Sequence, residues 1–485
     1  MSALKLDVVV VGAGLAGLAA ACALAVNGHR VRMFEKSPET PSVAGGIRLP
    51  PNAVRILKYL GMQDELSERS VLVTSVALRD LRTGELIGNA GWVPVMFKDS
   101  GGEARLIDHR DLCDMLCKRA IFAGANVSFN STVASVSPPS THAAPSGSDD
   151  QRPSVSLHSG EIIHADLIIG ADGARGVVRP VVDAQNPRSP WKGAYTGTTV
   201  YTGVCAAEHA ELEESGHEVD VWMSEGFHAM SYGTGRNEYV LHMERIEDFV
   251  DDQVDEWGTV PASSISQTGE LAPRIQRMLK GISSFARARC YEPSPADEWV
   301  DASETIILIG HAAHPMLPDA LHQSSNCLES AAVLATLLSH LRARDQLASL
   351  LYAYHDLRAP RAARLHELEV KNRCFTNLAG DQRTARDAAL RASFAKARSS
   401  QTREEALEAP NRHEDDDGEA LARHFAELLE GWGYDAREEA EEWWVRWGLL
   451  KERAIVSEHT GEDSRPGVVS GLGGVQFAKH TIEHA

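Results

Sequence analysis

The sequence predicts an α/β fold: a parallel sheet flanked by helices, an inserted antiparallel sheet and a helical C-terminal region. Apolar runs at residues 8–11, 163–170 and 305–309 are typical of strands buried on both faces. Residues 194–243 instead hold short segments of alternating polarity, which indicate antiparallel strands. Residues 420–450 are amphipathic at helical spacing and contain several tryptophans, which favours core packing.

Composition narrows the class of protein. A chain of 485 residues with 43% hydrophobic residues can hold a large core in two or three domains. The formal net charge of −20, from 68 acidic and 48 basic residues, argues against nucleic acid or an anionic membrane as a partner. The seven cysteines are scattered without a CxxC pair, so we expect a reducing, cytoplasmic location. We find no signal-peptide pattern and no apolar run of about 18 residues, and therefore expect no membrane span.

The first strand leads into a pattern that binds phosphate groups. Gly12, Gly14 and Gly17 follow residues 8–11 at GxGxxG spacing, and an Ala- and Leu-rich helix is predicted over 15–27. The first glycine permits a tight turn, the second lets the backbone approach a pyrophosphate, and the third lets helix and strand pack closely. The helix N-terminus offers free N–H groups to the phosphates.

A second strand over 31–34 ends at Glu35, whose carboxylate can accept a hydrogen bond from a ribose hydroxyl. An ordinary βαβ unit without a ligand is the alternative. The order of strand, glycines, helix, strand and acid favours the dinucleotide site.

Several shorter features follow. Gly45 and Gly46 indicate backbone lying close to a flat or bulky group, or a plain loop, before a helix over 53–60. A hairpin is predicted over 71–87. Asp108 is a predicted helix N-cap, which places Arg110 in a first turn, where a cation is unfavourable unless a ligand or solvent holds it.

The second half of the chain adds a turn at a strand end. Asp172 follows the strand at 163–170, at the edge where parallel sheets bind ligands, although a simple turn explains it equally well. A loop is predicted over 137–154, and residues 381–424 are polar and charged, with a linker predicted at 415–418. Helices are predicted over 265–282, 327–342 and 352–370.

Taken together, the GxGxxG unit with Glu35, the blocks at 165–173 and 310–318, and Arg110 resemble the single-component FAD-dependent aromatic monooxygenases, in particular their fungal salicylate-hydroxylase-like branch. The resemblance covers residues 5–370 and implies a discontinuous three-part architecture. This consists of a Rossmann-like, para-hydroxybenzoate-hydroxylase-like FAD-binding domain (1–70, 105–185 and 300–370), an antiparallel-sheet substrate domain (71–104 and 186–299) and a helical C-terminal region (371–485).

The resemblance also implies a chemistry. FAD would lie extended along the first domain, and its binding residues would be Gly12, Gly14, Gly17, Glu35, Gly46, Arg48, Arg110 and Asp172. NAD(P)H would bind transiently, and the reduced flavin would take up O₂ to give a hydroperoxide whose distal oxygen passes to an aromatic or polycyclic secondary metabolite. Hydroxylation or epoxidation is therefore expected.

The chain departs from the family pattern at the third block. His311 stands where the family has an Asp that accepts a bond from a ribityl hydroxyl, and residues 321–323 replace a glycine-rich turn, so this loop must follow a different path. The helix N-terminus near Ser324 could still face the flavin N1–C2=O edge. Thr202 replaces an arginine that is frequent in the family.

Two residues of the expected substrate sheet are catalytic candidates. His228 and Tyr232 share a face if they lie on one strand, because their spacing is even. The resemblance places Tyr232 in the pocket, where its hydroxyl can bond a substrate hydroxyl. His228 could act as the base that activates a phenol, and an edge histidine beside a core tyrosine is the alternative.

Other functions remain as alternatives. His311, His314 and His322 could bind a metal, but the resemblance gives His314 no such role and the nearby prolines restrict convergence, so we expect no metal site. The departures at the third block also suit a non-redox cyclase or isomerase. A non-enzymatic binding protein is the third possibility. The acidic C-terminal helices could mediate a homodimer.

Overall fold

The computed structural model describes residues 4–40, 45–89, 97–98, 100–140, 151–183, 193–210, 218–247, 257–265, 270–399 and 426–449. Most of the loop predicted over 137–154 lies outside these residues, as does the linker predicted at 415–418. Within the described ranges, no helix combines the length and the hydropathy that crossing a bilayer requires.

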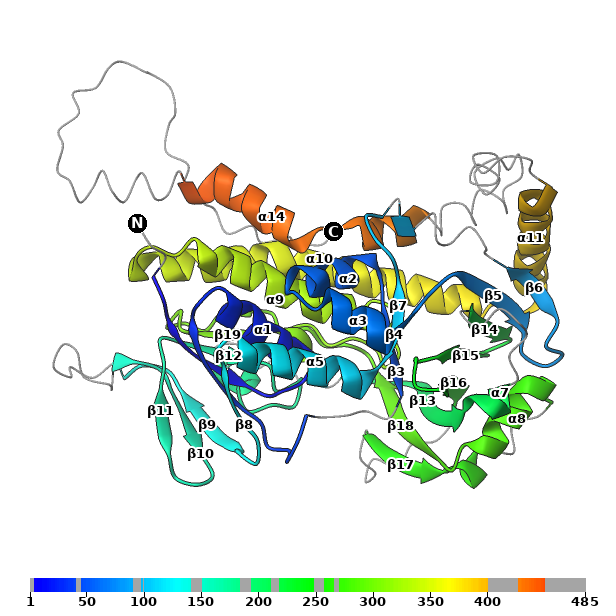
Figure 1. Ribbon diagram of the computed structural model, residues 1–485, viewed down its shortest axis with the longest axis horizontal. Helices are drawn as coiled ribbons and strands as arrows, with labels where there is room; N and C mark the ends of the chain where they lie inside the picture. Colours follow the sequence, from blue (N-terminus) through cyan, green and yellow to red (C-terminus); the bar gives the residue numbers. More distant parts are fainter. Residues whose placement is uncertain are drawn as a thin grey trace, which may run out of the picture. The chain divides into compact units, whose positions relative to one another are not determined.

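The first sheet is parallel, with the strand order β19-β12-β1-β2-β8. Its strands are β1 (Asp7–Val11), β2 (Arg30–Phe34), β8 (Asn126–Ser128), β12 (Leu167–Gly170) and β19 (Ile306–Leu308). The three predicted apolar strands therefore all form and lie next to one another in this sheet. Helix α1 (Leu15–Val26) packs against α5 (His109–Phe122) and α9 (Gln323–Ser339), and these elements gather around the sheet in Figure 1.

Two small sheets accompany the first. One contains β9 (Val133–Ser137), β10 (Ser154–Leu157) and β11 (Ile162–His164), and the other contains β3 (Gly46–Leu49), β4 (Ser70–Leu72) and β7 (Arg105–Asp108). The short helices nearby are α2 (Pro51–Tyr59), α3 (Gln63–Arg69) and α6 (Arg179–Val182). Asp108 caps α5 as predicted, because its side chain accepts from the backbone N–H groups of Arg110 and Asp111.

The second large sheet has the order β17-β18-β13-β16-β15-β14-β5-β6. Its strands are β5 (Ser75–Asp80), β6 (Leu86–Asn89), β13 (Tyr195–Ala206), β14 (Glu218–Ser224), β15 (Phe227–Gly233), β16 (Glu238–Ile246), β17 (Trp257–Pro261) and β18 (Ser284–Tyr291). The predicted hairpin appears as β5 and β6. The sheet is antiparallel as expected except at β5 and β14, which pair in parallel.

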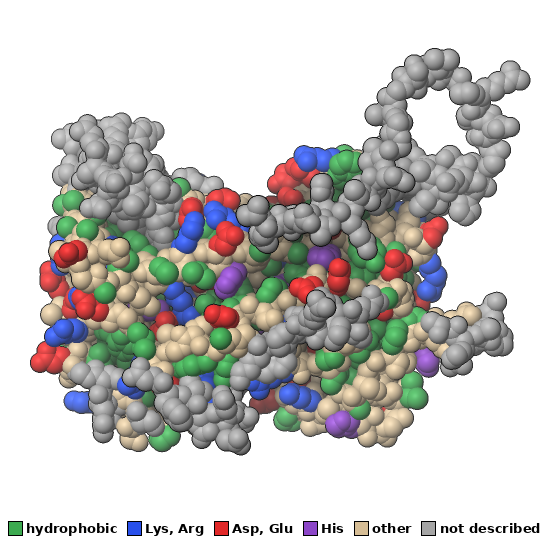
Figure 2. Space-filling view, turned by 180° about the vertical axis from the view of Figure 1, so that it is seen from behind, with side chains coloured by type: hydrophobic (Ala, Val, Ile, Leu, Met, Phe, Trp, Pro, Cys, Tyr) green, Lys and Arg blue, Asp and Glu red, His purple; other side chains and the backbone are tan. Residues whose placement is uncertain are grey.

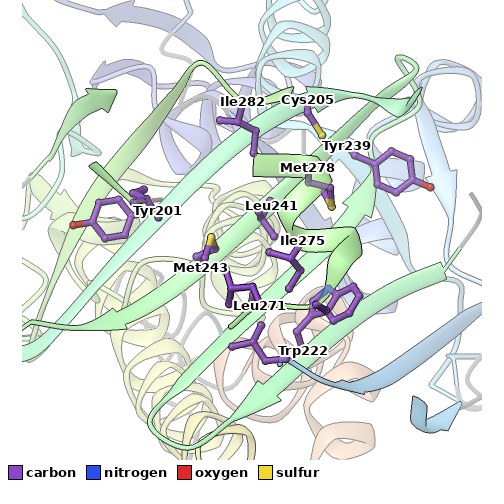
Figure 3. Close-up of a cluster of buried hydrophobic side chains, with 14 of the residues drawn as sticks. Tyr201, Cys205, Trp222, Tyr239, Leu241, Met243, Leu271, Ile275, Met278 and Ile282 are labelled. Carbon is purple, nitrogen blue, oxygen red and sulfur yellow. The ribbon is translucent and has the colours of Figure 1, made fainter. Parts of the chain in front are cut away.

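Helices cover one face of this sheet. These are α7 (Ala207–Ala210) and α8 (Pro273–Gly281), and Figure 3 shows Ile275 and Met278 of α8 packed with Leu241 and Met243 of the sheet. The helix predicted over 265–282 starts late, because Ile265 follows the 3-10 turn Ala262–Ser264 and the helix begins at its proline.

Long helices complete the fold. The α10 helix (Leu347–Thr376) extends beyond the predicted 352–370, and α9 begins at Gln323 rather than at residue 327. The start of the polar, charged stretch predicted over 381–424 is helical, because α11 (Gly380–Ser399) forms there. Leu390 and Phe394 of α11 lie four residues apart and are buried in the core that includes Ile87 of β6, so their packing outweighs the polar composition.

The C-terminal part is helical where it is described. Residues 426–433 form a helix, followed by α14 (Ala436–Trp443) and the π-helical turn Trp444–Gly448. Contacts divide the chain into Met1–Glu442 and Trp443–Ala485. The predicted three-part division remains a prediction. On the face drawn in Figure 2, acidic and basic side chains of the described residues are interspersed.

Candidate functional site

Three cavities of the larger unit share lining residues and therefore form a series. The first, the long groove, has a volume of about 580 Å³ and runs past β1, the start of α1 and the end of β12. The middle cavity, of about 80 Å³, shares Ile47, His109 and Gln323 with the groove. The apolar cavity, of about 190 Å³, shares Arg48 and Asp319 with the middle cavity.

The predicted glycines shape one end of the long groove. Gly12 has φ of +97°, and a Cβ there would lie 2.7 Å from the Ala171 carbonyl oxygen. A Cβ at Gly17 would lie 2.1 Å from the Gly12 carbonyl oxygen. A Cβ at Gly14 would meet no protein atom within 4 Å, and Gly14 lines the groove. The space beside Gly14 is therefore open to a ligand.

Glu35 lies at the same end and is 5% exposed. Its two carboxylate oxygens accept hydrogen bonds from the backbone N–H groups of Ala13 and Ser37, at 2.8 and 2.9 Å. A carboxylate offers about four acceptor positions, so it can still accept from a ribose hydroxyl. The N-cap of α1 is Gly14, which has no side chain to satisfy the first-turn N–H groups, and these remain available to an anion.

Asp172 follows β12 and lines the long groove. One of its oxygens accepts from the Val178 N–H at 3.2 Å, while the other is buried and has no hydrogen-bond partner among the described residues. Burial raises the pKa of Asp172 to about 6, although the Val178 N–H favours the ionised form. The carboxyl group therefore closes the turn through one oxygen, and its role in a cofactor site remains a prediction.

This pKa predicts a pH effect on stability. The folded-state pKa lies above the usual value of 3.8, so the folded protein holds a proton that the unfolded chain releases. The stability contribution of Asp172 therefore falls as the pH rises from about 4 to about 6. In FAD-free protein, Asp172→Asn is expected to become more stable relative to the wild type over this range, which thermal unfolding at several pH values measures. A constant difference across the range would contradict the assignment.

The three histidines of the metal hypothesis have separate environments. His311 lines the long groove, its Nε2 is buried without a partner, and burial lowers its pKa, which keeps the ring neutral. His314 Nε2 lies 2.8 Å from Ser330 Oγ, and His322 Nδ1 lies 2.6 Å from Glu369 Oε1. In the part of the chain that the structure describes, no group of three or more His, Cys, Asp or Glu side chains is placed to hold a metal ion.

The glycines at the start of β3 allow a close approach to the second large sheet. A Cβ at Gly46 would lie 2.7 Å from the ring of Tyr232, and one at Gly45 would lie 2.5 Å from the methyl group of Thr202. The flat group expected near these glycines is therefore in part a tyrosine of the chain itself. Gly45, Gly46 and Tyr232 all line the middle cavity.

A hydrogen-bonded chain starts at the Tyr232 hydroxyl, which lies 2.9 Å from His242 Nε2. His242 Nδ1 lies 2.9 Å from Thr202 Oγ1 and 3.6 Å from Asp319 Oδ1. Because the carboxylate favours a proton on Nδ1, Nε2 accepts from the tyrosine. Burial raises the pKa of Tyr232 and lowers that of His242, so both are neutral near pH 7.

Arg48 connects the middle and apolar cavities. Its Nη2 donates to Asp319 Oδ1 at 2.8 Å and to the Asp319 carbonyl oxygen at 2.5 Å. Asp319 has φ of +59°, while His322 has φ of −93°, so the loop follows the different path that the sequence required. Ser324 Oγ donates to the Arg48 carbonyl oxygen at 2.5 Å and joins the start of α9 to β3.

Arg110 is exposed in the first turn of α5, and its role in a cofactor site remains a prediction. Its neighbour His109, which the sequence did not single out, lines both the long groove and the middle cavity. Gln323, at the start of α9, lines the same two cavities.

The apolar cavity lies on the face of the second large sheet opposite α8. His228 and Met230 of β15 line it, while Tyr232 on the same face reaches the middle cavity. His228 Nδ1 lies 3.0 Å from Asn377 Oδ1. Trp432 lines the cavity and packs edge-on against Phe97 at 5.2 Å, so this tryptophan belongs both to the core and to the site.

Sequence reasoning missed His242, Asp319 and the cavity role of Trp432. The turn at residues 233–237 was a usable signal for His242, because the β15–β16 hairpin pairs Tyr232 with Val240 and Met230 with His242. No comparable local pattern marked the other two residues.

Comparisons with known proteins agree with this geometry. A family model described as "FAD binding domain" matches residues 5–369. The chain is 29% identical over 362 residues to the 3-amino-4-hydroxybenzoate 2-monooxygenase of Streptomyces cremeus, covering 74% of this chain and 84% of that protein. It is 24% identical over 401 residues to the FAD-dependent monooxygenase OpS4 of Beauveria bassiana, covering 79% and 89%.

A solved structure shares the fold. The salicylate hydroxylase substrate complex matches with a TM-score of 0.65 at 19% identity, over 90% of this chain and 97% of that one. At this identity the match supports the architecture, a parallel sheet joined to a second sheet and long helices, and carries no conclusion about ligands.

Proposed function

Because the chain belongs to the FAD-binding-domain family, we propose that it is an FAD-dependent monooxygenase that uses NAD(P)H and O₂ to hydroxylate or epoxidise an aromatic small molecule. One observation carries the proposal. The long groove at the uncapped N-terminus of α1 and the apolar cavity each share lining residues with the same middle cavity, so a dinucleotide and an aromatic ring can bind next to each other.

The groove residues fit the cofactor. Gly14 leaves open space beside the N-terminus of α1 for a pyrophosphate, and Glu35 offers acceptors for the adenosine ribose. Asp172 and His311 each present a buried polar atom without a partner among the described residues. When bound, FAD supplies the redox chemistry, and the protein supplies orientation and a site that excludes water.

The residues around the other two cavities have distinct roles in this proposal. His228 lies beside the substrate and accepts the proton of a phenol hydroxyl. Tyr232 keeps its proton and donates it in a hydrogen bond to His242. Both residues line the middle cavity, where the isoalloxazine ring of the cofactor would end. Arg48 and Ser324 keep β3 and α9 in position around the same point.

The test uses the purified full-length chain. We expect flavin absorbance, NAD(P)H oxidation that an aromatic substrate stimulates, and incorporation of one oxygen atom from labelled O₂. Turnover under anaerobic conditions without nicotinamide would instead support a cyclase or isomerase. Colourless protein that takes up no added flavin would overturn both, in favour of a non-enzymatic binding protein.

His311→Asp is expected to tighten FAD binding about tenfold. A hydrogen bond to a charged acceptor contributes about 1.5–3 kcal/mol, compared with about 0.5–1.5 kcal/mol for a neutral one, and about 1.4 kcal/mol corresponds to a factor of ten. Titration of FAD-free protein with FAD, followed by flavin fluorescence, measures the change. His311→Asn is the matched neutral control and should bind like the wild type. Unchanged or weaker binding by His311→Asp would contradict the assigned role.

Three further predictions belong with this proposal. The use of O₂ and NAD(P)H as co-substrates follows from the proposed reaction. The acidic C-terminal helices could mediate a homodimer, and the scattered cysteines favour a cytoplasmic location.

A further inference from the structure

We infer that the substrate is an uncharged aromatic molecule with a hydrogen-bond acceptor next to the ring, and that Trp432 donates to this acceptor. This inference rests on the proposed function and specifies its substrate class. Two observations on the apolar cavity support it: the charged groups of its lining are already paired, and the Trp432 indole N–H has no partner among the described residues.

Among the described residues, every arginine that lines the apolar cavity already has a carboxylate partner. Arg48 pairs with Asp319 at 2.8 Å. Arg105 pairs with Glu103 at 2.9 Å, and Arg373 pairs with Glu244 at 2.5 Å. A carboxylate ligand would therefore have to compete with a bound carboxylate for any of these cations, in surroundings where ion pairs are only weakly screened.

Two carboxyl groups also line the cavity itself. Burial works to raise the pKa of Asp319 and of Glu369, but Arg48 beside the first and His322 beside the second hold both pKa values below the usual range. Both groups are therefore ionised near pH 7, and they offset the positive charge of Arg48 in the lining, which an anionic ligand would otherwise use. The remaining lining is mostly aliphatic and aromatic, which suits a neutral ring.

Trp432 supplies the one indole donor of the described lining. The residue is 9% exposed, and its Nε1 is buried without a hydrogen-bond partner among the described residues. An indole N–H is only a donor, and leaving it unpaired in the core costs about 1–3 kcal/mol. A ligand carbonyl, ether or hydroxyl oxygen that packs against the Nε1 edge of the indole would satisfy it.

The volume limits the size of the ring. The cavity measures about 190 Å³, compared with about 150 Å³ for an engineered apolar cavity that binds benzene. One substituted ring fits inside.

Matched pairs of ligands test the charge argument on the FAD-loaded protein. The probes are the 2-, 3- and 4-hydroxybenzamides and the corresponding hydroxybenzoates, which have nearly the same shape but differ in charge. Changes in the flavin absorbance give each dissociation constant. In at least one pair, we expect the dissociation constant of the amide to be at least tenfold lower than that of the acid. Equal or tighter binding of the acids, or binding by neither member of any pair, would overturn the inference.

Trp432→Phe tests the donor. It keeps the aromatic ring and removes the N–H, so the best amide should bind about fivefold more weakly, as expected for one neutral hydrogen bond. Binding of 3-methylphenol, which has no carbonyl group, should not change. The matched control is Trp222→Phe, because the Trp222 indole donates to Ser231 Oγ at 3.0 Å in the core on the opposite face of the sheet. Equal loss for both ligands in Trp432→Phe would overturn the assignment.

The same samples distinguish this inference from the proposed function. Flavin absorbance and substrate-stimulated NAD(P)H oxidation report on the proposed function alone. A protein that binds FAD and oxidises NAD(P)H but prefers the acids would contradict only the substrate class.

Discussion

Gly14→Ala is expected to weaken FAD binding about 30- to 150-fold while leaving the FAD-free protein folded. The added Cβ meets no protein atom within 4 Å, and Gly14 has φ of −69°, so alanine fits the apoprotein without strain. The methyl group would instead occupy the space for the pyrophosphate. Forcing an extra methyl group into a packed contact costs about 2–3 kcal/mol, which gives this loss of affinity.

Two matched glycine variants make this result specific. Gly17→Ala should destabilise the FAD-free protein itself, because its Cβ would lie 2.1 Å from the Gly12 carbonyl oxygen. At Gly433 an added Cβ also meets no atom within 4 Å, but this residue lines none of the three cavities described. Gly433→Ala should therefore change neither the stability nor the affinity for FAD. Thermal unfolding and flavin titration of the three variants measure both effects. Wild-type affinity in Gly14→Ala would remove the basis for placing FAD in the groove.

The sequence predicted the backbone geometry at this end of the groove because that geometry is local. The turn, the open space at Gly14 and the position of Glu35 all depend on residues within one βαβ unit. The cap of α5 by Asp108 is local in the same sense. The fold class followed from these units and from the switch to alternating polarity.

The middle of the site could not be predicted in the same way, because it depends on pairing between distant segments. Asp319 bonds Arg48 across 271 positions, and its φ of +59° is tolerated because the arginine holds both its carbonyl and its carboxylate. Trp432 reaches the apolar cavity from beyond residue 400. The exception is His242, the hydrogen-bond partner of Tyr232. Its position depends only on the register of the β15–β16 hairpin, which the sequence of the turn could have predicted.

The α11 helix shows a second limit. Its sequence is polar and charged, yet Arg386 and Asp387 are buried and paired at 2.7 Å, and Leu390 and Phe394 enter the core. The overall composition of such a segment hides the few apolar residues that face the neighbouring sheet. Those residues, and not the average polarity, determine whether the segment packs as a helix.

Glu329→Gln is expected to destabilise the protein by about 3–5 kcal/mol, the usual effect of breaking a buried ion pair by removing one partner. Glu329 on α9 is fully buried and pairs with Arg358 at 2.6 Å and with Arg361 at 3.0 Å, both on α10. Its Oε1 also accepts from Asn52 Nδ2 of α2 at 2.6 Å. Glutamine would leave two cations close together without the charge that offsets them, and denaturant unfolding measures the loss.

The pH dependence separates this electrostatic cause from a simple packing defect. Burial favours the neutral acid, but Arg361 and Arg358 overcome this effect and hold the pKa of Glu329 below its usual value of 4.5. The stabilisation is therefore complete above about pH 4.5 and is lost as the pH falls through the lower, folded-state pKa. The difference between wild type and Glu329→Gln should accordingly shrink in acid, whereas a packing defect would persist. Glu367→Gln, which removes an exposed pair with Arg364 on α10, is the control and should change stability by at most about 1 kcal/mol.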